Sequence, residues 1–269
     1  MAKIEWSELG LWVCVAIGVG LVIFHTVAGF YHLKYYVLRA DTPEDWKCQP
    51  KRKLPARLQR RAVLLSTYNL VAAGTLTGIF LYAMDHGMPT PIYYQVADYG
   101  WTYTLLSTAL LFVLVDGLAY YVHRTLHIPF LYRRFHRAHH AFVATTPYVT
   151  AAIHPVVFIV LQAATFAPIL LIPFHALSIV GVFVYVLIFN IIDHSGVSLG
   201  SRIPWQASSH FHDDHHAHFH VNFGQHLMLW DRLHGTLRRE GRTYGVNVFG
   251  GRGVPVPSAS SGSDDVVRY

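Results

Sequence analysis

Long apolar runs are the most prominent pattern along the chain. An α-helix needs about 20 apolar residues to cross the hydrocarbon core of a bilayer, and three runs reach that length. They are residues 9–30, 62–84 and 101–122. Two shorter runs, 156–174 and 176–192, follow each other so closely that they favour a pair of helices that enters the membrane and returns. The pattern predicts an all-α integral membrane protein with four to five transmembrane helices.

The composition supports a membrane protein. Of the 269 residues, 53% are hydrophobic and 13% are charged, whereas a soluble domain carries about 25% charged residues. The formal net charge is +6. Such a basic excess is typical of proteins that bind nucleic acid or an anionic membrane surface, and the apolar runs favour the membrane. We therefore expect no nucleic-acid partner.

Lysine and arginine are distributed unevenly between the loops. Residues 31–61 carry nine of them, and residues 85–100 carry none. Because basic loops stay in the cytoplasm, we expect 31–61 to face the cytoplasm and 85–100 the opposite side. The later runs then return the chain to the cytoplasm at residue 123 and again after residue 193. The expected location is a bacterial inner membrane or the membrane of the endoplasmic reticulum.

Histidines are concentrated at the expected cytoplasmic side. Fourteen of the nineteen lie between residues 123 and 220. Histidines three or four positions apart on a helix lie about 5–6 Å apart on one face, which lets them share a metal ion. The candidates are His123 and His127; His136, His139 and His140; His194; and His212, His215 and His216. One zinc ion takes three or four protein ligands, so these nine histidines predict two ions in a helical cap on the cytoplasmic side. Imidazole suits Zn, Cu, Fe and Ni, so ligand type alone does not select the metal.

The histidine motifs and their surroundings carry a family resemblance. Over roughly residues 100–240 the chain resembles the integral-membrane fatty acid hydroxylase and sterol desaturase superfamily, most closely its C-5 sterol desaturase branch. The resembling stretches, in chain order, are "DGLAYYVHRTLH", "FHRAHH", "TPYVTAAIHPV", "DHSGV" and "HDDHHAHFHVNFGQHLMLWDRLHGT". The resemblance implies that the nine histidines hold two Fe ions as a non-haem di-iron centre that activates O₂. It also implies a lipid substrate from the bilayer and an external electron donor of the cytochrome b5 or ferredoxin type.

This resemblance predicts desaturation or hydroxylation of a C–H bond in a sterol or fatty-acyl lipid, and no motif separates the two outcomes. Carotenoids and alkylglycerols are alternative substrates within the superfamily. A di-zinc hydrolase of the membrane surface is the alternative from another enzyme class, although the sequence contains no convincing H-E-x-x-H motif. A metal transporter is disfavoured because the histidines gather at one face instead of along a path through the membrane.

Further residues are candidates for supporting the ligands. Asp116 lies inside an apolar run, two helical turns before His123, and metal-bound histidines commonly donate their second ring N–H to a carboxylate. His154, followed by Pro155, is expected either to support a ligand or to fix a turn. Asn190 occupies a position four before His194 where some members of the superfamily have a further ligand, and we expect it to support the site. Five other histidines are expected at the surface or behind the ligands: His210, His218, His220, His226 and His234.

The same considerations divide the chain into three regions. Residues 1–100 are expected to form an N-terminal transmembrane region, and residues 101–245 the catalytic domain. Residues 246–269 are rich in Gly, Pro and Ser, a composition typical of disordered segments, so we expect a disordered tail.

Overall fold

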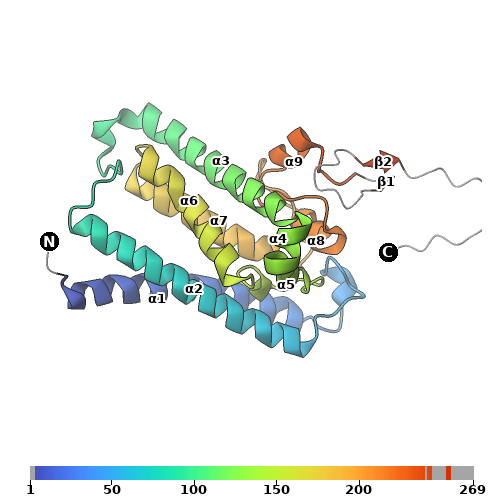
Figure 1. The fold of residues 1–269 in the computed structure, drawn as a ribbon. Helices are drawn as coiled ribbons and strands as arrows, with labels where there is room; N and C mark the ends of the chain where they lie inside the picture. Colours follow the sequence, from blue (N-terminus) through green and yellow to red (C-terminus); the bar gives the residue numbers. More distant parts are fainter. Residues whose placement is uncertain (1–3, 240, 244–252, 256–269) are drawn as a thin grey trace, which may run out of the picture.

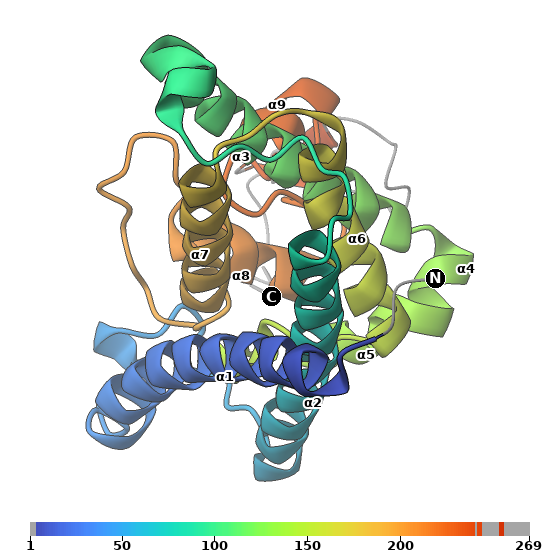
Figure 2. The same ribbon diagram turned by 90° about the vertical axis from the view of Figure 1, so that its left-hand side faces the viewer.

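The long helices lie side by side and form the body of the molecule (Figure 1). The computed structural model describes residues 4–239, 241–243 and 253–255. The long helices are α1 (Trp6–Tyr31), α2 (Ala56–Asp85), α3 (Gly100–Leu126), α6 (Pro155–Leu171) and α7 (Ala176–Asp193). Figure 2 shows them arranged around the middle of the bundle.

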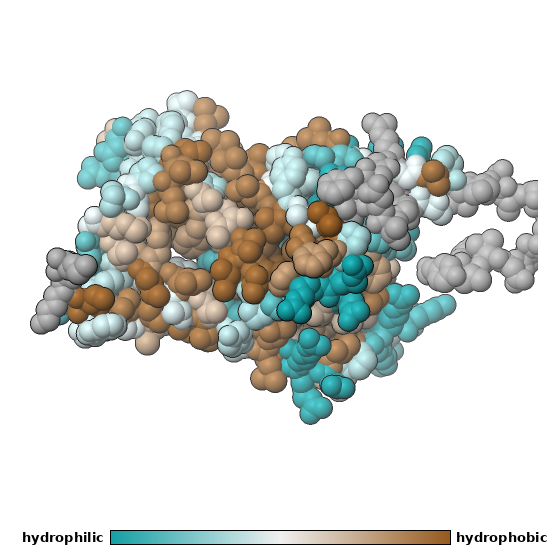
Figure 3. Space-filling view, viewed as in Figure 1, coloured by the Kyte–Doolittle hydropathy of each residue, from teal (hydrophilic) through white to brown (hydrophobic). Residues whose placement is uncertain are grey.

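Four of these helices are long and apolar enough to cross a membrane: α1 with its π-helical continuation to Val37, α2, α3 and α7. Helix α6 is apolar but has only 17 residues, a length of about 26 Å at 1.5 Å per residue. The expectation of four to five membrane helices is therefore confirmed. Figure 3 shows the corresponding apolar surface over the helices, with polar residues gathered toward the end that carries α4, α5 and α8.

Helices α1 and α2 approach each other closely along two glycines. A Cβ atom on Gly74 would lie 2.6 Å from the Cα atom of Ile17, and one on Gly78 would collide with the backbone of Val13. Small residues four apart let membrane helices pack backbone to backbone. The G-x-x-x-G spacing in α2 therefore fixes α1 against the rest of the bundle.

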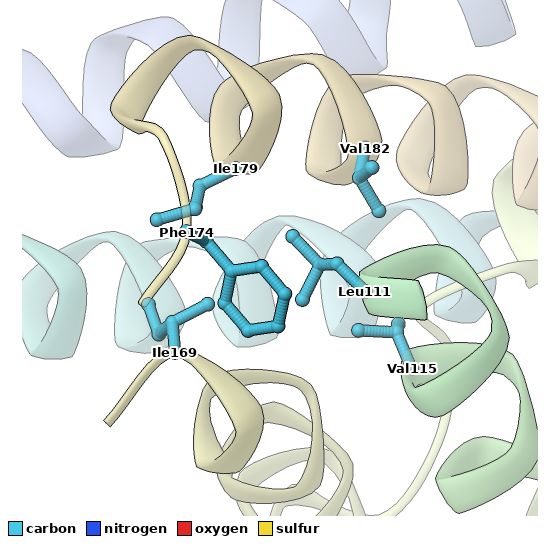
Figure 4. Close-up of a cluster of buried hydrophobic side chains, with 6 residues drawn as sticks. All are labelled: Leu111, Val115, Ile169, Phe174, Ile179 and Val182. Atoms are coloured by element: carbon cyan, nitrogen blue, oxygen red, sulfur yellow. The ribbon is translucent and has the colours of Figure 1, made fainter. Parts of the chain in front are cut away.

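The turn between α6 and α7 is tied to the loop that precedes α3. The Tyr93 N–H donates to the Phe174 carbonyl over 3.1 Å, and the Ala176 N–H donates to the Tyr93 carbonyl over 2.9 Å. Phe174 also belongs to a buried apolar cluster that joins α3, α6 and α7 (Figure 4). Its members are Leu111, Val115, Ile169, Phe174, Ile179 and Val182. The predicted pair of short apolar helices thus returns the chain to the end from which it started.

The short helices gather at that end, opposite the N-terminus (Figure 1). They are α4 (Pro129–Leu131), the π-helical turn Tyr132–His136, α5 (Arg137–His140), α8 (Ser209–His218) and α9 (Leu229–His234). Strands β1 (Arg242–Thr243) and β2 (Val254–Pro255) pair antiparallel. Two residues of the predicted disordered tail thus form a strand, and the rest of that tail, apart from Gly253, lies outside the described residues. The division into regions 1–100 and 101–245 stays a prediction.

Candidate metal centre

The nine predicted histidines are brought together at one end of the bundle in two groups. Each side chain is at most 6% exposed, although the residues come from α3, α5, α7, α8 and the turns that follow or precede them. Within each group the candidate ligand atoms lie within 4.8 Å of one another. The first group is His123, His127, His136, His140 and His215, and the second is His139, His194, His212 and His216.

The ring nitrogens within each group face one another at short distances. In the first group, Nε2 of His140 lies 3.2 Å from that of His127, 3.1 Å from that of His136 and 3.2 Å from that of His215. In the second group, Nε2 of His212 lies 2.9 Å from that of His194. A neutral imidazole has one N–H and one lone pair, so three such contacts around one nitrogen cannot all be good hydrogen bonds. A cation between the rings satisfies every lone pair at once.

Backbone carbonyls orient four of these rings. A carbonyl oxygen only accepts, so the Nδ1 atom that faces it carries the proton and Nε2 keeps the lone pair that binds metal. The pairs are His123 with Phe223 (2.8 Å), His215 with Val221 (2.7 Å), His194 with Asn190 (2.9 Å) and His139 with Ala152 (3.4 Å). The rings are therefore held as metal ligands by the protein itself, and this donor set fits a pair of imidazole-bound metal ions.

Burial keeps the imidazoles neutral at neutral pH. Removal from water disfavours the charged form and lowers the pKa of His194 from 6.5 to about 4. The same cause, with contributions from neighbouring histidines, places the pKa of the other ligands outside the membrane spans well below 6.5. These are His127, His136, His139, His140, His212, His215 and His216. Because a metal ion binds only the neutral imidazole, the site is in its binding form.

The segment after α8 supplies two of the orienting carbonyls, and Asp231 shapes it. The buried Asp231 carboxylate accepts the N–H groups of Phe223 (2.9 Å) and Gly224 (2.8 Å) and the hydroxyl of Thr236 (2.5 Å). Asn222 adopts a left-handed conformation with φ of 53°, and its side-chain amide donates to the carbonyl of Phe211 over 3.0 Å. The "NFG" and "WDRLHGT" stretches thus position carbonyls behind the metal ligands.

Asp116 has different partners from those that the sequence suggested. Its carboxylate accepts the N–H of His226 over 3.0 Å and the indole Nε1–H of Trp230 over 2.8 Å. The expected partner, His123, donates to the Phe223 carbonyl instead. Two helical turns separate Asp116 from His123, about 10 Å along α3. The next residue is Gly117, where a Cβ atom would lie 2.7 Å from the Trp230 ring. Asp116 therefore anchors both the segment before α9 and Trp230 of α9 on α3.

The other two supporting candidates have modest structural roles. The ring of His154 accepts the N–H of Val156 over 3.2 Å and caps the start of α6, which is the turn alternative of the two that the sequence left open. Asn190 supports a ligand through its main-chain carbonyl, which accepts from His194, and its side chain lines a cavity.

A cavity of about 490 Å³ extends from the histidines into the bundle. Its walls come from α1, α2, α3, α6 and α7 and are predominantly apolar. Ligands of both groups border it: His123, His136, His139, His194 and His212. The sequence also placed His226 among residues at the surface or behind the ligands, whereas it lines this cavity and is 1% exposed. His226 has no helical spacing to the ligands, so the sequence pattern contained no signal for this position.

Comparison with known proteins agrees with this geometry. Residues 108–236 match the sequence profile of the family described as fatty acid hydroxylase. A Delta(7)-sterol 5(6)-desaturase of Aspergillus fumigatus is 34% identical over 226 residues, which cover 83% of this chain and 64% of the relative. Lathosterol oxidase of Mus musculus is 31% identical over 151 residues, or 55% of this chain and 50% of the relative. A Delta(7)-sterol 5(6)-desaturase of Schizosaccharomyces pombe is 30% identical over 176 residues, or 65% of this chain and 58% of the relative.

The chain thus spans about half to two thirds of the length of these curated relatives. No solved structure gives a significant match to the chain.

Proposed function

Because residues 108–236 make the chain a member of the fatty acid hydroxylase family, we propose that it is a membrane oxidoreductase that uses O₂ to desaturate a sterol. The observation that carries this proposal is the pair of buried all-histidine groups at the end of an apolar cavity. The relatives named as sterol desaturases and as lathosterol oxidase support the choice of substrate.

Two iron ions are the proposed cofactors. The first group offers five imidazoles and the second offers four, and each set can hold one ion. Bound iron would supply the activation of O₂. The chain orients the ligand rings through the carbonyls of Phe223, Val221 and Asn190, and burial keeps water and protons away from them.

The cavity is suited to a lipid of moderate size. Ligand pockets commonly have volumes of about 300–1,000 Å³, and this cavity has about 490 Å³ with largely aliphatic and aromatic walls. Since it lies among helices whose outer surfaces are apolar, a bilayer lipid is the class of molecule that can reach it. The ligands at its end would face a C–H bond of the bound lipid.

The reaction requires an external source of electrons. Desaturation takes two hydrogen atoms from the lipid. Together with two electrons from a donor and two protons from the solvent, they reduce one O₂ to two waters. A protein of the cytochrome b5 or ferredoxin type is the proposed donor. The exposed side chains of Arg133, Arg134 and Arg137 lie beside the ligand-bearing α5, and the basic segment 51–61 is largely exposed as well. These positive charges favour an acidic partner.

The excess of basic residues in 31–61 favours the cytoplasmic side for this end of the bundle. The proposed location is a bacterial inner membrane or the membrane of the endoplasmic reticulum.

Lipid analysis of a host that expresses the chain tests the function. We expect a product sterol lighter by two hydrogens in cells with the wild-type chain. It should be absent with His139→Ala, which removes a ligand of the second group, and present with His210→Ala, which removes an exposed histidine on α8. A product heavier by one oxygen atom would show that the reaction is hydroxylation and not desaturation. A fatty-acyl, carotenoid or alkylglycerol product would replace the sterol. If the purified protein contains zinc in place of iron and consumes no O₂ when a reductant is added, the alternative function as a hydrolase would be favoured.

A further inference from the structure

His226 is a buried polar residue in the wall of the apolar cavity. Its side chain is 1% exposed, and it borders the cavity together with ligands of both histidine groups. The ring packs against Phe112 and Tyr185. Nε2 has no hydrogen-bond partner among the described residues, and Nδ1 has only a carboxylate oxygen of Asp193 at 3.5 Å. A buried nitrogen without a partner costs about 1–3 kcal/mol, so its retention in a cavity wall points to a ligand.

A carboxylate determines which ring nitrogen of His226 carries the proton. Oδ2 of Asp193 lies 3.5 Å from Nδ1, and both side chains are almost completely buried. Gln206 holds the same carboxylate with its amide N–H over 3.2 Å, and Tyr185 donates to Gln206 over 2.9 Å. A carboxylate oxygen only accepts, so this contact fits the tautomer with the proton on Nδ1. Nε2 is then a lone pair that can only accept.

The neighbouring residue offers a second acceptor. Gln225 also lines the cavity, and its buried Oε1 atom has no partner in the part of the chain that the structure describes. The backbone here is fixed, because the N–H of His226 donates to Asp116 on α3 over 3.0 Å. We infer that His226 and Gln225 form a subsite that accepts a hydrogen bond from a hydroxyl group of the lipid substrate. The subsite selects lipids with a free hydroxyl group over ethers and esters of the same size.

This subsite deepens the proposed function and rests on it for the position of the reacting carbon. Asp193, which orients His226, directly precedes the ligand His194 in the chain. His226 also lines the same cavity as His194 and His212 of the second histidine group, so the carbons close to a hydroxyl bound by His226 are the ones presented to the metal site. A sterol has its hydroxyl on a ring, so the ring that carries it would enter the site.

Binding to the purified full chain in detergent micelles tests the subsite without turnover. The first probe pair is tritiated lathosterol, displaced by unlabelled lathosterol or by its 3-O-methyl ether. The second pair is tritiated 1-hexadecanol, displaced by the alcohol or by hexadecyl methyl ether. An ether cannot donate a hydrogen bond, and the loss of one such bond to a buried acceptor lowers affinity about tenfold. We expect this preference for the alcohol in the wild type and its loss in His226→Phe.

Two further variants separate recognition from general damage. His226→Gln places an amide oxygen near the lost acceptor and should keep part of the preference. His234→Phe removes a half-buried imidazole that does not line the cavity and should keep all of it. If His226→Phe does not give a monodisperse protein, the wild-type and His226→Gln comparisons carry the test.

Equal affinities for alcohol and ether in both pairs, an undiminished preference in folded His226→Phe, or no binding of either alcohol would overturn the subsite. A preference limited to the hexadecanol pair, and lost in His226→Phe, would support the subsite and reject a sterol as the substrate.

Discussion

Acidification should unfold the metal-free protein over a narrow range of pH. Eight of the nine ligand histidines lie outside the membrane spans, and each has a pKa lowered by burial and by its neighbours. Each of these imidazoles is neutral in the folded protein and becomes protonated in the unfolded protein below pH 6.5. Stability is therefore fully present above the unfolded pKa of 6.5 and is lost as pH falls toward the folded pKa, which is about 4 for His194.

The magnitude follows from proton linkage. For His194, the free energy of unfolding should fall by about 1.3 kcal/mol between pH 7.5 and 5.5, because the unfolded imidazole binds a proton that the folded one does not. The pKa values of the other seven imidazoles are lowered in the same direction, so each adds to this loss, and the whole stability of a typical domain is only about 5–15 kcal/mol. Bound metal should oppose this loss, because protons must first displace it.

Unfolding of chelator-treated protein in mixed detergent micelles by added SDS measures this effect at a series of pH values. His212→Gln removes one buried titrating ring and should reduce the slope near pH 5.5 by about 1.2 kcal/mol per pH unit. His210→Gln, on the exposed face of the same helix, is the matched control and should leave the slope unchanged. A free energy of unfolding that stays constant between pH 7.5 and 5.5 would refute the argument that the buried imidazoles are held neutral.

Two further experiments probe the bundle and its site. Asp116→Asn keeps one acceptor oxygen and replaces the other by an NH₂ group, so it cannot accept from both the His226 N–H and the Trp230 indole N–H. SDS unfolding should therefore show a loss of about 1–3 kcal/mol, while iron per folded chain stays at the wild-type value because His123 is held by the Phe223 carbonyl. A drop in iron affinity of about 10–100-fold would instead restore Asp116 as the support of a ligand. In a background without Cys14 and Cys48, single cysteines at the exposed positions Asp98 and His210 should react with an impermeant thiol reagent from opposite sides of the membrane. Reaction from the same side would contradict the proposed topology.

The membrane helices and the nine histidines could be predicted from the sequence because both leave a periodic signal. Apolar runs of span length and spacings of three or four are visible in the order of residues alone. The partition into groups of five and four was not visible, because it depends on how α3, α5, α7 and α8 approach one another in space.

The features of the site that could not be predicted from the sequence depend on backbone geometry. Every residue has a carbonyl, so nothing marked those of Val221, Phe223 and Asn190 as the ones that orient ligand rings. The expectation for Asp116 was wrong in its partner for the same reason, since the segment 226–230 folds back onto α3 and takes its carboxylate. His226 acquires its position in the cavity from this same contact.

The two histidine groups share their supporting helices, so they form one structural unit. Neighbouring residues on a helix point about 100° apart. Helix α5 therefore directs His140 into the first group and His139 into the second, and α8 likewise divides His215 from His212 and His216. A displacement of either short helix moves ligands of both groups together. Because both groups also border one cavity, a molecule that occupies the cavity faces the two ligand sets at once. Two independent metal sites on separate elements would not guarantee this arrangement.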